Sequence, residues 1–537
     1  MPRDPMTPCV TLVRGPLVAT PRALNTEATP ALGVAYLMGT LVHAGIPCAF
    51  VDGVGEGLNQ RWRVRYRSAY AQGLQLEEIV ARVPAETTLI GLTSMFSGDW
   101  PVLRDLAALL RKRFPQVIIV AGGEHVTALS EYCLRECPAI NLAVRGEGEA
   151  TVLALARGET TVAGTAYINK AGQYIEVGGL PRTRAIDALP RPYWPPGYLE
   201  KFWAAGKSFG VQSERDMPIL ATRGCPYRCT FCSSPQMWTT TYVLRDVEDV
   251  IAEIKSYIAR YVITSLQYYD LTAITKKSWI MQFCTRLLEE GIHVPWSLPS
   301  GTRSEALDTE TLTLLKRTGC TYLVYAPESG SQATLETIKK RMDLAKLTAS
   351  VLEAKRLGLV IRTNLIIGFP HETRRDIWMT LRYGLYLAWH GADEVTVNIF
   401  SPYPGTELFE QLVKDGTLKV NDDYFYDLSS LNSDFLTLHP LTVNKHVGRV
   451  ELALYRTSAM FLNYLVGYLH YPRRIGRSVG NLWHGTHAAT VLEHRLNDAL
   501  RRWPVRRLKQ AGAWGLVVVA YWYSYITLLT ALAGVTR

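Results

Sequence analysis

Short apolar runs alternate with segments of helical spacing over the first third of the chain. Runs of strand length cover residues 10–18, 47–51, 88–93, 117–121 and 141–144. Between them, residues 31–44 and 100–114 place apolar side chains at helical spacing. Apolar strands that alternate with amphipathic helices predict an α/β fold with a doubly wound, Rossmann-like parallel sheet. Ligands of such sheets bind at the carboxyl ends of the strands, where this sequence carries glycines and polar residues.

Strands and helices alternate again between Pro218 and about residue 401. Strand-like runs cover residues 263–268, 296–300, 322–326, 361–367 and 394–400. With an apolar strand that begins at Pro218 they make six strand–helix units, which predicts a partial (β/α)6 barrel of the TIM type. Its site is expected at the strand ends. Six units would leave the barrel open on one side for a large ligand.

A proline-rich segment separates the two alternating regions, with prolines at positions 181, 190, 192, 195 and 196. We therefore expect a Rossmann-like domain over residues 1–165 and a linker over 166–215. The partial barrel would cover 216–430, and a C-terminal helical region would cover 431–537.

Composition favours a globular intracellular protein. Of the 537 residues 48% are hydrophobic and 20% charged. No secretory signal opens the chain, so a cytoplasmic location is expected. Nine cysteines include three within eight residues, which disfavours a disulfide framework and favours a metal site in a reducing compartment.

The net charge of +10 is concentrated near the C-terminus. Residues 471–509 hold nine Lys and Arg against two acids. They precede 24 uncharged residues at 511–534, which is long enough to span a bilayer. This arrangement points to an anionic lipid surface more than to nucleic acid. Two interpretations stay open: a membrane-associated tail, or a helix pair with 452–470 that packs on the barrel.

The strand that begins at Pro218 leads into the motif Cys-x3-Cys-x2-Cys, formed by Cys225, Cys229 and Cys232. Thiolates are the usual ligands of iron–sulfur clusters, and three of them leave one iron of a [4Fe–4S] cluster open. A structural zinc site requires four ligands, and the sequence has no fourth Cys or His nearby at the spacing typical of zinc ligands. The other six cysteines are expected to serve packing.

The cysteine spacing, with the aromatic Phe231 just before the third cysteine, resembles the signature of the radical S-adenosylmethionine (SAM) superfamily. The resemblance implies that SAM chelates the open iron. One electron from the cluster then cleaves SAM to a 5′-deoxyadenosyl radical, which abstracts hydrogen from the substrate. It also implies that Phe231 neighbours the adenine, and that an electron donor such as flavodoxin or ferredoxin is a partner.

Later strand ends carry further elements similar to those of this superfamily. Glu328, Ser329 and Gly330 resemble the segment near the SAM ribose and amino acid. Asn364 and the Gly368-Phe369-Pro370 turn resemble the strand that shapes the adenine pocket. Arg303 is a candidate partner of the SAM carboxylate, although an arginine at a strand end is a surface charge about as often. Residues 401–406 resemble a closing motif of cobalamin-dependent members.

The Gly-rich strand ends of the first region resemble the cobalamin-binding domain that precedes many radical SAM barrels. The residues expected to contact cobalamin are Ser94, Gly122, Gly123, Glu124, His125, Gly146 and Glu147. Singly, each of these glycines is also explained by a tight turn. The loops over 94–100 and 122–127 would pack against the corrin. The Asp-x-His-x-x-Gly loop of one family variant is absent from the sequence, so the lower face of cobalamin should lack a protein histidine. The lone His125 is expected to be a hydrogen-bonding loop residue.

These resemblances imply a cobalamin-dependent, class B radical SAM enzyme. Two classes of reaction stay open. One is methyl transfer from methylcobalamin to an unactivated carbon or phosphorus of a small, lipophilic molecule. The other is radical oxidation or cyclisation, as in the anaerobic magnesium-protoporphyrin ester cyclases. Nucleic acid is not expected as a substrate, because the extra cysteines and basic β-domain of transfer-RNA methylthio-transferring relatives have no counterpart here.

Overall fold

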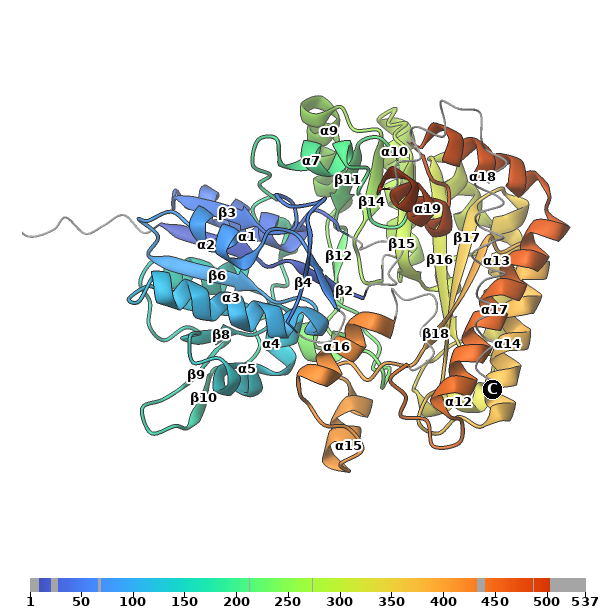
Figure 1. Ribbon diagram of the computed structural model, residues 1–537. Helices are drawn as coiled ribbons and strands as arrows, with labels where there is room; N and C mark the ends of the chain where they lie inside the picture. Colours follow the sequence, from blue (N-terminus) through green and yellow to red (C-terminus); the bar gives the residue numbers. More distant parts are fainter. Residues whose placement is uncertain are drawn as a thin grey trace, which may run out of the picture.

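The computed structural model contains two α/β units that lie side by side (Figure 1). It describes residues 9–502, apart from 21–27, 66–68, 212, 273, 432–439 and 486.

The first unit is a seven-stranded sheet with the strand order β10-β9-β8-β7-β6-β1-β3. Its strands are β1 (Val10–Arg14), β3 (Cys48–Asp52), β6 (Leu89–Thr93), β7 (Ile118–Gly122), β8 (Leu142–Val144), β9 (Thr165–Ile168) and β10 (Tyr174–Val177). The five strands predicted from apolar runs pair in parallel. The strands β9 and β10 add an antiparallel edge that the sequence pattern did not predict.

Helices cover both faces of this sheet, which confirms the doubly wound prediction. They are α1 (Leu32–His43), α2 (Leu76–Arg82), α3 (Trp100–Arg113), α4 (Glu124–Ala128), α5 (Ser130–Glu136) and α6 (Glu149–Ala156). Side chains of β1 contribute to the apolar cores on both faces of the sheet. Val10 and Leu12 belong to one apolar cluster with α1 and α6, while Val13 belongs to the other with α3. Successive side chains of a strand point to opposite faces, so one strand serves two layers.

The strand predicted over 10–18 is two strands. β1 ends at Arg14, and after Gly15 and Pro16 the chain enters β2 (Leu17–Ala19). β2 pairs with β5 (Tyr70–Gln72), and β5 pairs with β4 (Arg61–Arg63), in a small antiparallel sheet. Proline has no backbone N–H for a sheet ladder and glycine weakens a strand, which explains the break.

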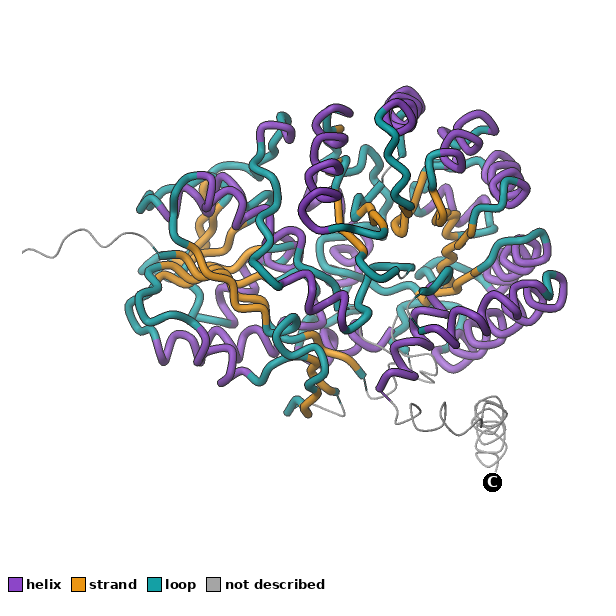
Figure 2. Tube along the Cα trace, turned by 90° about the horizontal axis from the view of Figure 1, so that it is seen from above, coloured by secondary structure: helices purple, strands orange, loops and turns teal. Residues whose placement is uncertain are grey.

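The second unit is a six-stranded parallel sheet whose strands follow chain order. They are β11 (Asp216–Ile219), β14 (Ser265–Tyr268), β15 (Trp296–Thr302), β16 (Cys320–Glu328), β17 (Val360–Ile367) and β18 (Glu394–Ile399). The helices between them are α9 (Val247–Tyr261), α10 (Lys277–Glu289), α11 (Thr309–Arg317), α12 (Gln332–Thr337), α13 (Leu344–Arg356) and α14 (Arg374–Trp389). Figure 2 shows the strands as an arc with helices along its outer side, which is the predicted partial barrel.

The predicted linker over residues 166–215 packs largely with the first unit. The boundary predicted at residue 165 falls at the start of β9, and β10 also lies beyond it. The helix α7 (Tyr198–Ala204) follows, and the Tyr198 hydroxyl donates to Asp52 at the end of β3 over 2.8 Å.

The helices after β18 pack against both units. α15 (Glu407–Lys414) follows β18, and α16 (Asp422–Leu431) returns to the first unit, where Arg104 and Asp422 form an ion pair at 2.7 Å. α17 (Arg449–His470) packs on β18 and α14, followed by α18 (Arg473–His484) and α19 (Val491–Arg502). Within the described residues, none of the helices has the length and apolar character needed to cross a bilayer. The uncharged run at 511–534 lies outside the described residues.

Candidate functional site

The three cysteines of the Cys-x3-Cys-x2-Cys motif lie in one loop at the end of the barrel's first strand. The short β12 (Thr222–Arg223) pairs with β13 (Val243–Leu244) and holds the start of the loop. Gly224 follows with φ +87°, and a Cβ there would lie 2.2 Å from the Thr241 carbonyl oxygen, so only glycine fits. Cys232 N donates to the Cys229 carbonyl over 3.1 Å, and α8 (Ser234–Trp238) then begins.

Burial and the neighbouring thiols raise the pKa values of two of these cysteines. Burial raises the pKa of Cys229, and it raises the pKa of Cys232 to about 12. The Cys225 and Cys229 sulfurs add to the rise at Cys232, which places the three sulfurs within electrostatic reach of one another. All three cysteines are free and partly exposed.

Within the described part of the chain, no three His, Cys, Asp or Glu side chains lie close enough to bind a single ion. A cavity of about 410 Å³ adjoins the loop. It is lined by Leu180, Arg228, Cys229, Cys232, Pro235, Gln236, Thr239, Thr240, Gly405, Thr406, Glu407 and Glu410.

Basic side chains surround the same loop. The Arg303 guanidinium lies 4.0 Å from the centre of the Tyr227 ring. Its Nη2 pairs with Glu305 at 2.8 Å and donates to the Arg341 carbonyl, while its Nε is buried without a partner among the described residues. Lys340 pairs with Glu328 at 2.9 Å, and its charge opposes the rise in the pKa of Cys229 that burial causes. The structure therefore places Arg303, Glu328 and Lys340 near Cys229, while the contacts of Arg303 and Glu328 with SAM remain predictions.

Phe231 points toward the turn after β17, its ring centre 5.7 Å from that of Phe369. Gly368 has φ +87°, and its N–H donates to the Glu372 carboxylate over 2.6 Å. Burial raises the pKa of Glu372 to about 7. Two elements expected around the adenine, Phe231 and Gly368, thus belong to one cluster of residues.

The other SAM candidates have their polar groups engaged within the protein. The Ser329 hydroxyl bonds to Thr380 of α14 over 2.8 Å, and a Cβ on Gly330 would lie 2.7 Å from the Met379 carbonyl oxygen. The Asn364 amide oxygen accepts from Arg362 and Thr396 at 2.9 and 2.7 Å. Their contacts to SAM remain predictions.

The strand-end loops of the first sheet bring most of the cobalamin candidates together. Ser94 N donates to the Gly122 carbonyl over 2.7 Å, and His125 N donates to the Ser94 carbonyl over 3.2 Å. A Cβ on Gly123 would lie 2.5 Å from the Ser94 carbonyl oxygen. The Ser94 hydroxyl is buried, with no hydrogen-bond partner in the described chain.

His125 is enclosed by aromatic rings. Its ring centre lies 5.1 Å from that of Trp100 and 5.3 Å from that of Phe425, and Nδ1 bonds to the Ser97 hydroxyl over 2.9 Å. Burial lowers its pKa to about 3, so the imidazole is neutral at physiological pH. A side chain held in this way fits the expected role of a hydrogen-bonding loop residue.

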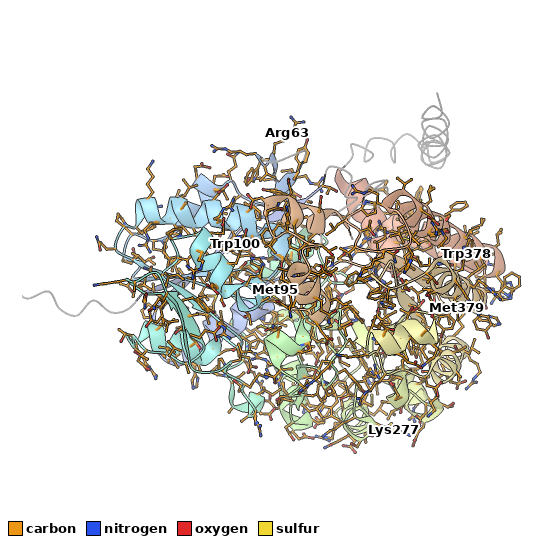
Figure 3. The ribbon with its side chains drawn as sticks, turned by 90° about the horizontal axis from the view of Figure 1, so that it is seen from below. Arg63, Met95, Trp100, Lys277, Trp378 and Met379 are labelled. Atoms are coloured by element: carbon orange, nitrogen blue, oxygen red, sulfur yellow. The ribbon has the colours of Figure 1, made fainter. Side chains whose placement is uncertain are left out.

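Two apolar side chains of the same loop point to solvent. Met95 and Phe96 are 51% and 58% exposed at the end of β6 (Met95 and Trp100 are labelled in Figure 3). Large apolar side chains exposed side by side commonly mark a binding site. The strand ends therefore fit a large, partly apolar ring system such as a corrin, and both residues lie in the loop over 94–100 that is expected to pack against it.

The two loop regions touch each other. The Ser233 hydroxyl, next to Cys232, donates a hydrogen bond to Glu124 of α4. A Cβ on Gly405, in the loop after β18, would lie 2.9 Å from the Ala128 side chain of α4. The cysteine loop and the first sheet's strand ends thus share one interface.

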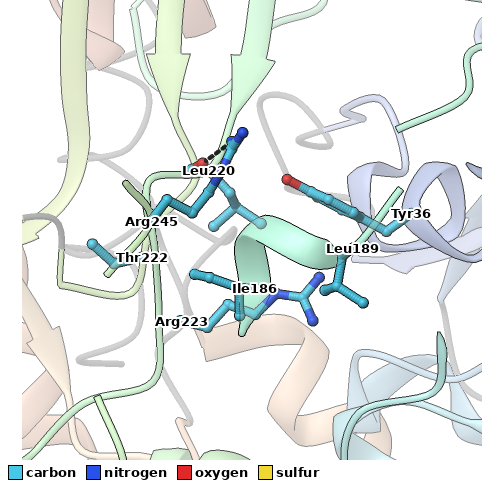
Figure 4. A pocket seen from close by; sticks show the side chains of 7 residues that line it. All are labelled: Tyr36, Ile186, Leu189, Leu220, Thr222, Arg223 and Arg245. Atoms are coloured by element: carbon cyan, nitrogen blue, oxygen red, sulfur yellow. Dashed lines mark hydrogen bonds between the residues drawn. The ribbon is translucent and has the colours of Figure 1, made fainter. Parts of the chain in front are cut away.

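Buried charge pairs join the units beside this contact. Arg223, two residues before Cys225, binds Glu147 at 3.0 Å and Glu149 at 2.7 Å. Arg182 binds Glu147 at 3.1 Å. Arg223 also lies over the Tyr36 ring of α1 at 4.9 Å, beside a small cavity (Figure 4). Sequence reasoning named Glu147 as a cobalamin contact, but the structure engages its carboxylate in the domain interface.

Gly146 lies at the same strand end with φ +75°, and its N–H donates to the Thr127 hydroxyl. Glu149 belongs to the same segment of the predicted cobalamin-binding domain, and the structure pairs it with Arg223 at 2.7 Å.

Known families match both units. The radical SAM superfamily matches residues 219–384, and the B12 binding domain matches residues 26–156. An uncharacterized methyltransferase of Pyrococcus horikoshii is 28% identical over 403 residues, which cover 74% of this chain and 81% of that protein. The anaerobic magnesium-protoporphyrin IX monomethyl ester cyclase of Rubrivivax gelatinosus is 24% identical, covering 71% of this chain and 66% of that enzyme.

A solved structure shares the fold. The radical S-adenosylmethionine methyltransferase TsrM of Kitasatospora setae, with cobalamin and a [4Fe–4S] cluster bound, aligns with a TM-score of 0.58 at 16% identity. The alignment covers 76% of this chain and 75% of TsrM. At this identity the likeness concerns the fold alone.

Proposed function

Because the chain belongs to the radical SAM enzymes that carry a B12-binding domain, we propose that it transfers a methyl group to an unactivated carbon or phosphorus of a small molecule. The cofactors of this family are a [4Fe–4S] cluster, SAM and cobalamin. One observation carries the proposal: the cysteine loop and the strand-end loops of the first sheet meet directly through Ser233 and Glu124.

When bound, the cluster and SAM supply a 5′-deoxyadenosyl radical, and cobalamin supplies the methyl group. Cys225, Cys229 and Cys232 hold the cluster in this proposal. Arg303 and Lys340 provide positive charge beside the loop, which favours the SAM carboxylate. Phe231 and the Gly368 turn enclose the adenine.

On the other side of the interface, Met95 and Phe96 would lie against an apolar face of the corrin and exclude water from it. The proposal that no protein histidine binds the cobalt rests on the missing Asp-x-His-x-x-Gly loop, and the His125 ring is enclosed between Trp100 and Phe425. The domain contact keeps both sites in one shared space, as a reaction between two bound cofactors and one substrate requires.

Oxidation or cyclisation is the second candidate function. It is favoured by the Rubrivivax cyclase, which aligns over almost as much of this chain as the Pyrococcus methyltransferase does. Enzymes of the superfamily need a reductant; flavodoxin or ferredoxin would serve here. A lipophilic small molecule, and not a nucleic acid, remains the proposed substrate.

The deciding experiment uses SAM with a trideuterated methyl group. Anaerobically reconstituted protein is incubated with reductant, cobalamin and a lipid-soluble extract of the source cells, and the Cys225→Ala variant serves as control. A product that gains the labelled methyl group only with the wild type, together with comparable 5′-deoxyadenosine and S-adenosylhomocysteine, supports methyl transfer. A product without label, and no S-adenosylhomocysteine, would assign the enzyme to the second class.

A further inference from the structure

Exposed apolar side chains gather on three neighbouring helices of the second unit, far along the chain from the cysteine loop. Of the 23 large apolar side chains exposed among the described residues, 14 lie on α14, α17 and α18, so the surface is uneven. They are Trp378, Met379, Leu385, Tyr386, Trp389, Val450, Leu454, Phe461, Leu462, Leu465, Leu469, Ile475, Val479 and Trp483. We call this surface the α14–α17–α18 face.

These side chains follow helical spacing. On α17, Val450, Leu454, Phe461, Leu465 and Leu469 stand four or seven residues apart and form one stripe. The opposite side of α17 is buried against the barrel; it is mostly apolar but includes Arg456 and Asn463. A helix on the surface of a soluble protein usually has a polar outer side. α17 therefore carries a second apolar stripe beyond the one that the core needs.

The exposed apolar side chains of α14 lie next to those of α17. The rings of Trp378 on α14 and Tyr455 on α17 are 5.6 Å apart, and those of Trp389 and His470 are 4.5 Å apart. The two helices thus run side by side in the same direction, and Figure 3 shows Trp378 and Met379 on this side of the molecule. Ile475, Val479 and Trp483 on α18 continue the face at spacing i, i+4, i+8.

The exposed charges of these helices are mostly basic. Arg375, Arg382, Arg449 and Arg473 are exposed, while Glu451 is paired with Arg374 at 2.7 Å. Two copies joined through this face would place the arginines against one another, which disfavours a symmetric dimer. The chain then continues beyond α19 with Arg506, Arg507 and Lys509 and the uncharged residues 511–534.

We propose that the α14–α17–α18 face binds the surface of an anionic lipid bilayer. Apolar and aromatic side chains with basic residues beside them are the composition of segments that lie in the membrane interface. Trp378, Trp389 and Trp483 supply the indole rings that favour the headgroup level. The arginines supply attraction to anionic headgroups, which acts within about a Debye length of the surface.

The test measures flotation of the full chain with vesicles. We expect binding to vesicles of equal parts phosphatidylglycerol and phosphatidylcholine, and at least tenfold weaker binding to pure phosphatidylcholine. The double variant Leu454→Glu/Leu465→Glu should lose at least tenfold in affinity for the mixed vesicles. Val42→Glu/Val413→Glu, which changes two exposed apolar helix positions elsewhere, is the matched control and should bind as the wild type does.

A second measurement tests whether misfolding of a variant, rather than loss of lipid contact, explains weaker binding. Brominated lipid should quench the tryptophan fluorescence of the wild type, and Trp378→Tyr/Trp389→Tyr should reduce that quenching at an unchanged melting temperature. Undiminished vesicle binding by Leu454→Glu/Leu465→Glu, with loss of binding in the tail variant Val518→Asp/Leu528→Asp, would overturn the proposal in favour of the tail alone. A wild-type dimer in light scattering that the Leu454→Glu/Leu465→Glu variant abolishes, without vesicle binding, would identify the face as a contact between copies and would also overturn it.

Discussion

The carboxyl ends of the two parallel sheets present different chemistry at their shared interface. The barrel end offers three thiols with Arg303 and Lys340 beside them, which suits iron and a charged ligand. The first sheet's end offers exposed Met95 and Phe96 over a neutral, enclosed His125, which suits a large ring system. The cysteine loop binds through specific donor atoms, which require cysteines at a fixed spacing and so form a motif in the sequence. The end of the first sheet binds through its shape and apolar area, which many different residues can provide without a spaced motif.

Removing the three thiols should have the largest effect and should separate the two sites. Replacing Cys225, Cys229 and Cys232 together by Ala removes every predicted iron ligand of the loop. We expect iron to fall from about four per chain to background, and SAM cleavage to stop. Cobalamin binding should persist. Iron analysis, chromatography of 5′-deoxyadenosine and the absorbance of bound cobalamin test this, and SAM cleavage by the triple variant would refute the assignment.

Breaking the charge bridge between the sites should have the next largest effect. Arg223→Met leaves the buried Glu147 and Glu149 without their main partner, which typically costs about 3–5 kcal/mol. Urea unfolding should show this loss, and the segment around Arg182 should become sensitive to protease. Arg286→Met removes three surface ion pairs, with Glu248, Glu289 and Glu290, and should change stability little. Equal losses in both variants would contradict a special role for the interface.

Truncating the apolar side chains at the end of β6 should weaken cobalamin binding alone. Burying one such side chain against a ligand contributes roughly 1.5–3 kcal/mol, which corresponds to about ten- to hundredfold in affinity. We therefore expect Met95→Ala and Phe96→Ala each to raise the dissociation constant for cobalamin by about this factor, with iron content unchanged. Ile118→Ala, a similarly exposed position at the opposite end of β7, is the control. Unaltered titration curves for both variants would remove these residues from the site.

The smallest expected effect concerns pH and His125. Burial lowers its pKa to about 3 in the folded chain, against about 6.5 when unfolded. The unfolded chain therefore binds a proton that the folded chain does not, and stability is lost as pH falls from 6.5 toward 3. At pH 5 the loss is about 2 kcal/mol relative to pH 7. His125→Gln should reduce the difference between the free energies of unfolding at pH 7 and pH 5, measured by urea titration, by about 2 kcal/mol. An unchanged difference would mean that His125 is protonated in the folded state.

The sequence by itself determined the elements whose signals are local. Apolar runs located five strands of the first sheet and the six barrel strands to within a few residues, because a buried strand needs continuous apolar side chains. Cys225, Cys229 and Cys232 were readable as one site because all three stand in a single short loop.

Only the tertiary structure decided which distant residues meet. The antiparallel pairing of β9 and β10 extends the first sheet past the predicted boundary, because pairing at an edge depends on a neighbouring strand. Glu147 and Arg223 are 76 residues apart, so their ion pair exists only when the two units dock. The same docking brings Glu124 to Ser233. Whether Met95 faces solvent and Ser329 faces α14 is likewise set by packing, since the same residue types at a strand end serve either purpose.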